Sequence, residues 1–318
     1  MLTNLGTDVT LAAEMAQYDA YCKRILANKE ILSRILGRVV KEFQGMEFDE
    51  IAACIEDDLQ ISTVPVDPGM TNQKRVTGIQ TEDKIPLEGV IFYDIRFTAQ
   101  VPQNGGHIKL IINVEAQKKY HPGYDIVTRG IFYNSRQISA QLGTEFNVPD
   151  YQELKKVYSI WVCFSAPKKE ANAISEYSIT KRDIIPGIAD NPEAYDKFSV
   201  IVITLNSQVA SEDALVCMLN TLFGQQTISE KKTALKSFGI NTENLGKEME
   251  HMCNLSGLVL EEGIQQGIQQ GIQQGSEQTL TRLSILSKKL QELGKIDDLV
   301  KATTDPMFLK ELYEKYGL

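Results

Sequence analysis

The strongest constraint on the fold comes from residues 107–117, in which apolar side chains occupy every second position. The alternating apolar residues are Ile108, Leu110, Ile112, Val114 and Ala116. A period of two is typical of a β-strand that packs one face against a core. The opposite face carries Asn113, Glu115 and Gln117, and polar groups cost free energy when they are buried without partners. We therefore treat this polar face as a candidate site.

A second strand is predicted at residues 90–97, where apolar side chains again alternate. Ile91, Tyr93, Ile95 and Phe97 are expected on one face, with Asp94 on the other. The turn-rich stretch 101–106, which contains Pro102 and two glycines, is of the kind that closes a hairpin. Antiparallel pairing of the two strands would bring Asp94 beside Glu115.

Two neighbouring carboxylates are hard oxygen ligands that suit Mg²⁺. Asp and Glu are also common near strand ends, so the spacing of Asp94 and Glu115 alone fits two ordinary acids equally well. A metal site requires the two carboxylates to face each other, whereas two ordinary acids do not.

The same residues resemble a known family. Asp94 followed by Glu115-Ala116-Gln117 is similar to the PD-(D/E)XK nuclease signature, in the variant in which Gln replaces the terminal Lys. The segments 128–133 and 151–161 resemble the Rpn family of recombination-promoting nucleases, also called putative transposases. Residues 18–32 are similar to that family's opening Asp-x-x-x-Lys helix. The resemblance spans about residues 15 to 210.

This resemblance implies an α/β fold with a restriction-endonuclease-like mixed sheet flanked by helices. It also implies a Mg²⁺-dependent DNA endonuclease in which Asp94, Glu115 and the Ala116 carbonyl hold the metal. Gln117 would orient or polarise the attacking water. Because Gln carries no positive charge, we expect Lys118 or Lys119 to supply the missing cation. A catalytically weak or inactive DNA-binding relative, or a self-associating interaction protein, is the alternative.

DNA contacts are expected from the helix predicted at residues 124–142. One face carries Val127, Ile131, Ile138 and Leu142, and we expect it to pack on the core. Arg129, Tyr133 and Arg136 fall on nearly the opposite face, where they and Lys119 would meet phosphates. Any amphipathic surface helix has the same pattern, so the periodicity alone leaves both interpretations open.

Asp19 and Lys23 are spaced four residues apart and share one face of a predicted helix. This spacing is typical of a modest surface ion pair. In the light of the resemblance, the pair is also a possible edge of the active site.

Composition excludes several classes of protein. The net charge of -9 argues against a protein that coats nucleic acid, although binding depends on local potential. The five cysteines have no Cys-x-x-Cys spacing, which fits a reducing cytoplasm rather than a zinc site. The start of the chain lacks the pattern of a signal peptide, and no apolar run is long enough to span a membrane.

We divide the chain into a nuclease-like domain at 1–210 and a helical C-terminal region at 211–318. The latter contains three copies of Gly-Ile-Gln-Gln at 263–275. Two helices of this repeat could approach along their glycines and form a homo-oligomer, whereas interior glycines also weaken a helix by about 1 kcal/mol each. Helical self-association and a flexible tract both fit the repeat. Leucines at 280–293 predict an amphipathic helix, followed by a short helix that runs to Leu318.

Overall fold

The computed structural model describes residues 17–56, 60–61, 82–85, 89–103, 105–242, 245, 249–252 and 279–317. The chain divides into two compact units, Met1–Gly257 and Leu258–Leu318. The division comes later than the expected boundary at residue 210. Helices α5 (Ala214–Phe223) and α6 (Ile228–Ser237) contribute to the core of the first unit, which explains the difference.

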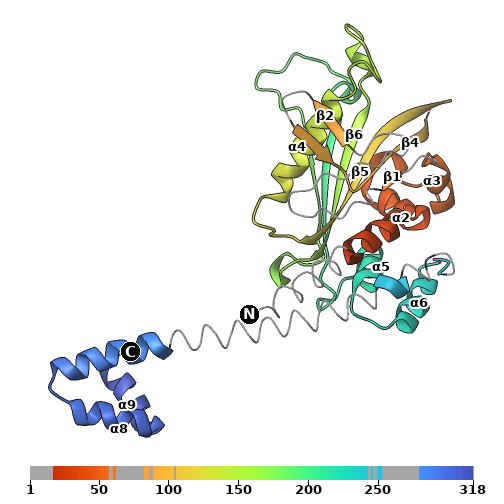
Figure 1. The fold of residues 1–318 in the computed structure, drawn as a ribbon. Coiled ribbons are helices and arrows are strands. Elements are labelled where there is room, and N and C mark those ends of the chain that lie inside the picture. Colours follow the sequence, from red (N-terminus) through yellow and green to blue (C-terminus); the bar gives the residue numbers. More distant parts are fainter. Residues whose placement is uncertain are drawn as a thin grey trace. The chain divides into compact units, whose positions relative to one another are not determined.

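A six-stranded mixed sheet is the centre of the first unit, which is an α/β structure (Figure 1). Its strands lie in the order β1 (Gln60–Ile61), β4 (Ile95–Gln103), β5 (Gly106–Lys119), β6 (Lys156–Ser165), β8 (Phe198–Thr204) and β7 (Ile174–Ser178). Strands β5, β6 and β8 are parallel, and the other neighbours are antiparallel. The predicted β4–β5 hairpin is confirmed, with Gln103 opposite Gly106.

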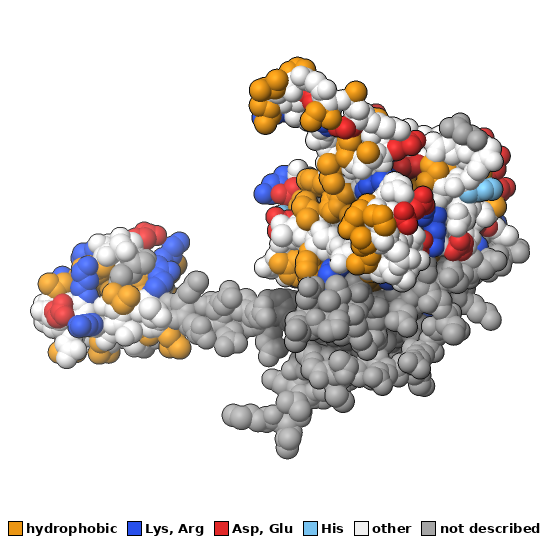
Figure 2. Space-filling model, turned by 90° about the horizontal axis from the view of Figure 1, so that it is seen from above, with side chains coloured by type: hydrophobic (Ala, Val, Ile, Leu, Met, Phe, Trp, Pro, Cys, Tyr) orange, Lys and Arg blue, Asp and Glu red, His pale blue; other side chains and the backbone are white. Residues whose placement is uncertain are grey.

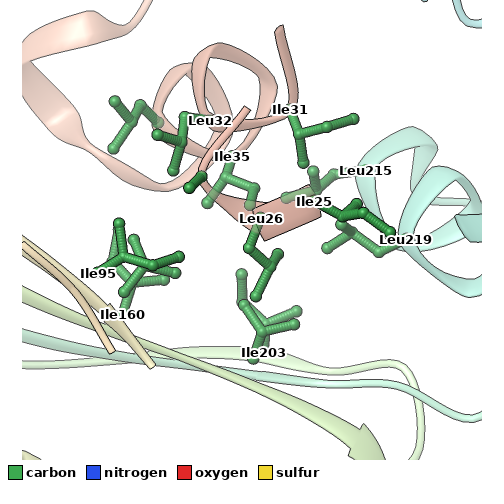
Figure 3. Close-up of a cluster of buried hydrophobic side chains, with 14 of the residues drawn as sticks. Ile25, Leu26, Ile31, Leu32, Ile35, Ile95, Ile160, Ile203, Leu215 and Leu219 are labelled. Atoms are coloured by element: carbon green, nitrogen blue, oxygen red, sulfur yellow. The ribbon is translucent and has the colours of Figure 1, made fainter. Parts of the chain in front are cut away.

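One face of the sheet is covered by the helix at residues 17–26, by α2 (Lys29–Val39), by α3 (Phe48–Cys54) and by α5. Figure 3 shows side chains from the helix at 17–26, from α2 and from α5 meeting isoleucines of three strands: Ile95, Ile160 and Ile203. Every second residue of β5 from Leu110 to Ala116 joins this core, as the alternation predicts. The apolar face of the sheet therefore forms the main hydrophobic core.

The opposite face is covered by α4 (Ile126–Ser139), which connects β5 to β6 (Figure 1). The helix packs on a smaller aromatic cluster that includes Tyr93, Tyr133 and Trp161. Short 3-10 helices lie at Lys41–Phe43, Tyr151–Glu153, Lys168–Glu170 and Pro192–Ala194. Among the residues that the structure describes, no helix has the length and apolar character to cross a membrane.

The single strand predicted at residues 90–97 is wrong. The chain leaves β3 (Gly89–Phe92), which pairs with β2 (Glu82–Ile85), and bends at Tyr93 and Asp94 before β4 begins. The bend places Tyr93 in the aromatic cluster, on the opposite side of the sheet from Ile95. A continuous period of two cannot predict such a bend.

The predicted orientation of α4 is also wrong. Ile131 is 44% exposed and Leu142 is 55% exposed, whereas Tyr133 and Arg136 are buried. The physical reason is that the sheet face beneath α4 carries buried polar groups beside its aromatic cluster. Its buried amides bond to that face: Asn134 donates to the Ser199 carbonyl, and Gln137 donates to Asn113. An apolar stripe would have left those partners unsatisfied.

The second unit is a small helical structure. A helix at residues 279–292 is followed by α8 (Ile296–Thr304) and α9 (Pro306–Tyr316). Their core consists of Leu286, Leu290, Ala302, Leu312 and Tyr313. The amphipathic helix predicted from the leucines at 280–293 is confirmed, whereas the short helix predicted up to Leu318 is two helices, α8 and α9. The repeat at 263–275 lies outside the described residues.

We predict that Gly130→Ala destabilises the first unit. A Cβ atom at Gly130 would lie 2.6 Å from Val200 Cγ1 and 2.9 Å from Trp161 Nε1. Helix propensity alone would favour Ala by about 1 kcal/mol, but forced displacement in a packed core costs about 1–3 kcal/mol. Urea unfolding should therefore give a lower free energy of unfolding. Ser135→Ala, at an exposed position of the same helix, is the control and should change stability little.

Candidate active site

Two hydrogen bonds join Asp94 to the neighbouring residues Glu115 and Ala116 of β5. The Asp94 backbone N–H donates to Glu115 Oε1 at 3.3 Å, and the Ala116 backbone N–H donates to Asp94 Oδ2 at 2.9 Å. Asp94 lies in the bend before β4 and Glu115 lies in β5, next to the antiparallel pair of Ile95 and Val114. The structure therefore brings together the two acids that the sequence singled out.

Glu115 is held by a chain of buried amides. Asn113 Nδ2 donates to Glu115 Oε1 at 3.1 Å, and Gln137 Nε2 donates to Asn113 Oδ1 at 2.5 Å. Glu115 is only 3% exposed, and both amide side chains are fully buried. The chain fixes the orientation of the carboxylate from the α4 side of the sheet.

The position of Glu115 is unfavourable for a negative charge. Burial, and then the nearby Asp94 carboxylate, raise the pKa of Glu115 well above its usual value. Hydrogen bonds from the Asp94 N–H and from Asn113 oppose this shift only in part. A buried carboxyl group with a strongly perturbed pKa beside a second acid is a recognised signature of functional sites.

Lys23 supplies a cation to this pair from the helix at residues 17–26. Its Nζ lies 2.8 Å from Asp94 Oδ1 and 2.6 Å from Asp19 Oδ2. The Lys23 side chain is 10% exposed, Asp94 is 20% exposed and Asp19 is 46% exposed. Burial lowers the pKa of Lys23, but Asp94 and Asp19 outweigh burial and raise it above its usual value. The pair proposed from spacing is therefore part of the site.

Arg129 lies over the aromatic cluster next to Glu115. Its guanidinium carbon is 5.0 Å from the Tyr133 ring centroid and 5.3 Å from the Trp161 ring centroid, and its Nη2 donates to the Tyr133 hydroxyl at 2.6 Å. Burial and the nearby Glu115 raise the pKa of Tyr133 to about 12. The cluster therefore places one half-buried cation and one neutral phenol beside the carboxylates.

The remaining residues of the motif are placed differently. Gln117 shares the face of Glu115 and is half-buried, and Lys119 is exposed at the end of the same face. Lys118 follows Ala116 on the opposite face, where burial lowers its pKa and Cys22 of the helical layer is an electrostatic neighbour. A strand turns alternate side chains to opposite faces, so Lys118 lies on the face away from Glu115, and of the two expected lysines Lys119 is the one on the face of Glu115.

The expected phosphate contacts of α4 also need correction. Tyr133 is buried, and Arg136 is only 4% exposed. Neither side chain presents its polar end to solvent on an outward face of the helix. Arg129 is half-buried at the edge of the site and Lys119 is exposed, so these two are the predicted DNA-binding residues that remain accessible.

The donor set fits a divalent metal. No group of three or more His, Cys, Asp or Glu side chains suited to a metal is found in the described part of the chain. A site with two carboxylates and a backbone carbonyl does not need three such side chains. Within an extended strand the N–H and C=O of one residue point to the same side, so the Ala116 carbonyl faces Asp94 as its N–H does. The ammonium of Lys23 lies against Asp94 Oδ1, where a metal ion would bind.

Sequence reasoning missed part of the site. Gln137 and Trp161 were not assigned to it, although Trp161 lies directly opposite Glu115 in the β5–β6 pairing. A signal was present: Ile126, Gly130, Tyr133, Asn134 and Gln137 recur at spacings of three and four and form the buried face of α4.

Comparisons with known proteins do not identify the chain. No family model, curated protein or solved structure matches it. The interpretation of the site therefore rests on its own geometry and on the sequence pattern.

We predict that Glu115→Gln stabilises the protein at pH 8. Because the pKa of Glu115 is raised on folding, ionisation of this carboxyl group destabilises the folded protein. The loss of stability grows as the pH rises from the unfolded-state pKa to the folded-state pKa, and it is constant at higher pH. Gln removes this cost, and its carbonyl can still accept from Asp94 and Asn113. The free energy of unfolding should rise by about 0.5–2 kcal/mol.

Asp94→Asn is the matched comparison. Burial raises the pKa of Asp94 as well, but Asn would leave the buried ammonium of Lys23 without this ion pair. Its free energy of unfolding should fall by about 1–3 kcal/mol. Urea titrations of both variants at pH 8 check the two signs. A Glu115→Gln variant less stable than wild type would contradict the assignment of Glu115 as a strained carboxylate.

Proposed function

We propose that this protein is a divalent-metal-dependent DNA endonuclease of the PD-(D/E)XK type, with a restriction-endonuclease-like core. The observation that carries the proposal is that Asp94 is hydrogen-bonded to Glu115 and to Ala116 beside the β4–β5 pair of a mixed sheet. The resemblance of Asp94…Glu115-Ala116-Gln117 to the nuclease signature supplies the reaction class. A role in recombination or transposition follows from the same resemblance.

The proposed roles follow from the positions of the side chains. Asp94, Glu115 and the Ala116 carbonyl would hold Mg²⁺, which lowers the pKa of bound water and neutralises charge on the phosphate. Gln117 lies on the face of Glu115 and can orient a water molecule by hydrogen bonding. Asn113 and Gln137 keep the Glu115 carboxylate in one orientation, and preorganised groups of this kind lower the cost of reaching the transition state.

DNA would approach the acidic pair from the side of Asp94, because Asp94 is more exposed than Glu115. Lys119, which is exposed, and Arg129, which is half-buried beside Glu115, can contact phosphates. On the face shown in Figure 2, basic and acidic side chains are interspersed, and hydrophobic side chains form several patches. The proposed DNA contact therefore depends on a few individual cations and not on a broad basic surface, which agrees with the net charge of -9.

A second candidate function is supported by one observation. The near-complete burial of Glu115, together with Gln in place of the usual Lys, favours a weak or inactive relative that binds DNA. Self-association is a separate proposal for the second unit, which exposes Leu280, Ile285, Leu293, Ile296, Val300 and Met307. Clusters of exposed apolar residues are typical of interaction surfaces.

Plasmid nicking tests the endonuclease proposal. With Mg²⁺, wild-type protein should convert supercoiled DNA to the open circular form, and EDTA should abolish the reaction. Asp94→Asn and Glu115→Gln should each lower the rate by at least about a hundredfold, the scale of losing one electrostatic group in an active site.

Glu145→Gln is the matched control for nicking, because Glu145 is a partly buried carboxylate that pairs with Lys109 at 2.6 Å away from the site. It should keep nearly full activity. Equal nicking by wild type and both site variants would overturn the assignment, whereas DNA binding without nicking would support the second candidate.

Lys119→Gln should weaken DNA binding in a salt-dependent manner. Loss of one phosphate contact should reduce the slope of log K against log salt concentration by about 1. Fluorescence anisotropy with a labelled duplex at several NaCl concentrations measures this slope. Lys41→Gln removes an exposed cation from the 3-10 helix Lys41–Phe43, and its slope should equal that of wild type.

A further inference from the structure

Lys23 is the cation that the structure brings closest to the acidic pair. Its Nζ lies between two carboxylates, 2.8 Å from Asp94 Oδ1 and 2.6 Å from Asp19 Oδ2. The motif itself has no cation at its last position, where Gln117 stands. The positive charge therefore comes to the site from the helix at residues 17–26.

The two partners of Lys23 differ in their other contacts. Asp94 also accepts the Ala116 N–H and lies beside Glu115, whereas Asp19 is about half exposed, one turn away on the same helix. Lys23 can therefore release Asp94 and keep an ion pair with Asp19 through rotation of its flexible side chain.

Arg129 is not an equivalent cation. Its guanidinium donates to the Tyr133 and Tyr124 hydroxyls and lies over the rings of Tyr133 and Trp161. These contacts hold Arg129 in one position, since planar stacking and fixed donors leave it little freedom. Among the side chains near Asp94, Lys23 combines direct contact with a second carboxylate that can receive it.

We propose that Lys23 is a resident counter-cation that a divalent metal displaces from Asp94, and that Asp19 receives its ammonium group. The inference rests on the proposed metal site. In the metal-free protein Lys23 neutralises Asp94 and keeps the carboxylate oriented toward Ala116. When a metal binds, two cations compete for Asp94 Oδ1, and Lys23 moves toward Asp19. Lys23 is in this sense a positioning residue that sets metal affinity.

Metal affinity can be read without any activity measurement. The chain has one tryptophan, Trp161, which pairs with Glu115 across the β5–β6 ladder. Mn²⁺ bound at Asp94 and Glu115 would therefore quench its fluorescence. Titration of the full chain with MnCl₂ gives a dissociation constant, which isothermal titration calorimetry can confirm.

The proposal predicts opposite effects for two neighbouring substitutions. Lys23→Met removes the competing cation, so Mn²⁺ should bind about tenfold more tightly, as expected when like charges a few Å apart are separated. Asp19→Asn removes the alternative partner, so Mn²⁺ should bind several-fold more weakly. In the double variant the Asp19 substitution should have little further effect, because there is no ammonium group for it to receive.

Arg24→Met is the matched control, because it removes the same charge from an exposed position of the same helix. Its Mn²⁺ affinity should stay near that of wild type. If Lys23→Met does not fold, Asp19→Asn still tests the proposal, since its site is partly exposed and tighter or unchanged binding would overturn it.

The remaining outcomes separate the two proposals. Mn²⁺ binding that Asp94→Asn abolishes and Lys23→Met leaves unchanged overturns the exchange and leaves the metal site standing. An effect of Asp19→Asn that is equally large in the Lys23→Met background also overturns the exchange. The absence of any Mn²⁺ binding by wild type and by Lys23→Met overturns the metal site and the exchange together.

Discussion

The burial of a carboxylate at Glu115 is the constraint on which the rest of the structure depends. An ionised group removed from water requires hydrogen bonds and nearby positive charge. Asn113 supplies a donor, Gln137 fixes Asn113, and the Asp94 backbone supplies a second donor. The orientation of α4 follows, because its amides must face the sheet. Gly130 allows the approach that these bonds need.

The sequence predicted the elements of the sheet well, because alternation directly reflects burial of one face. Strand β5 and the β4–β5 hairpin agree with the prediction. It failed where the surroundings, and not the local pattern, determine orientation. Ile131 of α4 points outward because the sheet beneath the helix carries buried polar groups beside its aromatic cluster, and Tyr93 changes sides at a bend.

In the candidate site, too, one part follows from the local sequence pattern and another part does not. The proximity of Asp94 and Glu115 could be predicted, because both residues belong to one hairpin. The source of the cation could not be predicted from neighbours in the chain. Lys118 is adjacent in sequence to Gln117 but lies on the other face of β5, whereas Lys23 comes from a separate helix and reaches Asp94. Lys23, which is distant in sequence, therefore supplies the positive charge that the local motif lacks.

The ion pair between Lys23 and Asp94 also has a consequence for the order of folding. A hairpin closes a short loop and forms early, whereas a contact between a helix and a strand distant in sequence loses more loop-closure entropy and forms late. Asp94 and Glu115 therefore meet before the helix at residues 17–26 docks. A nascent chain passes through a stage in which two acids are adjacent and their cation has not arrived.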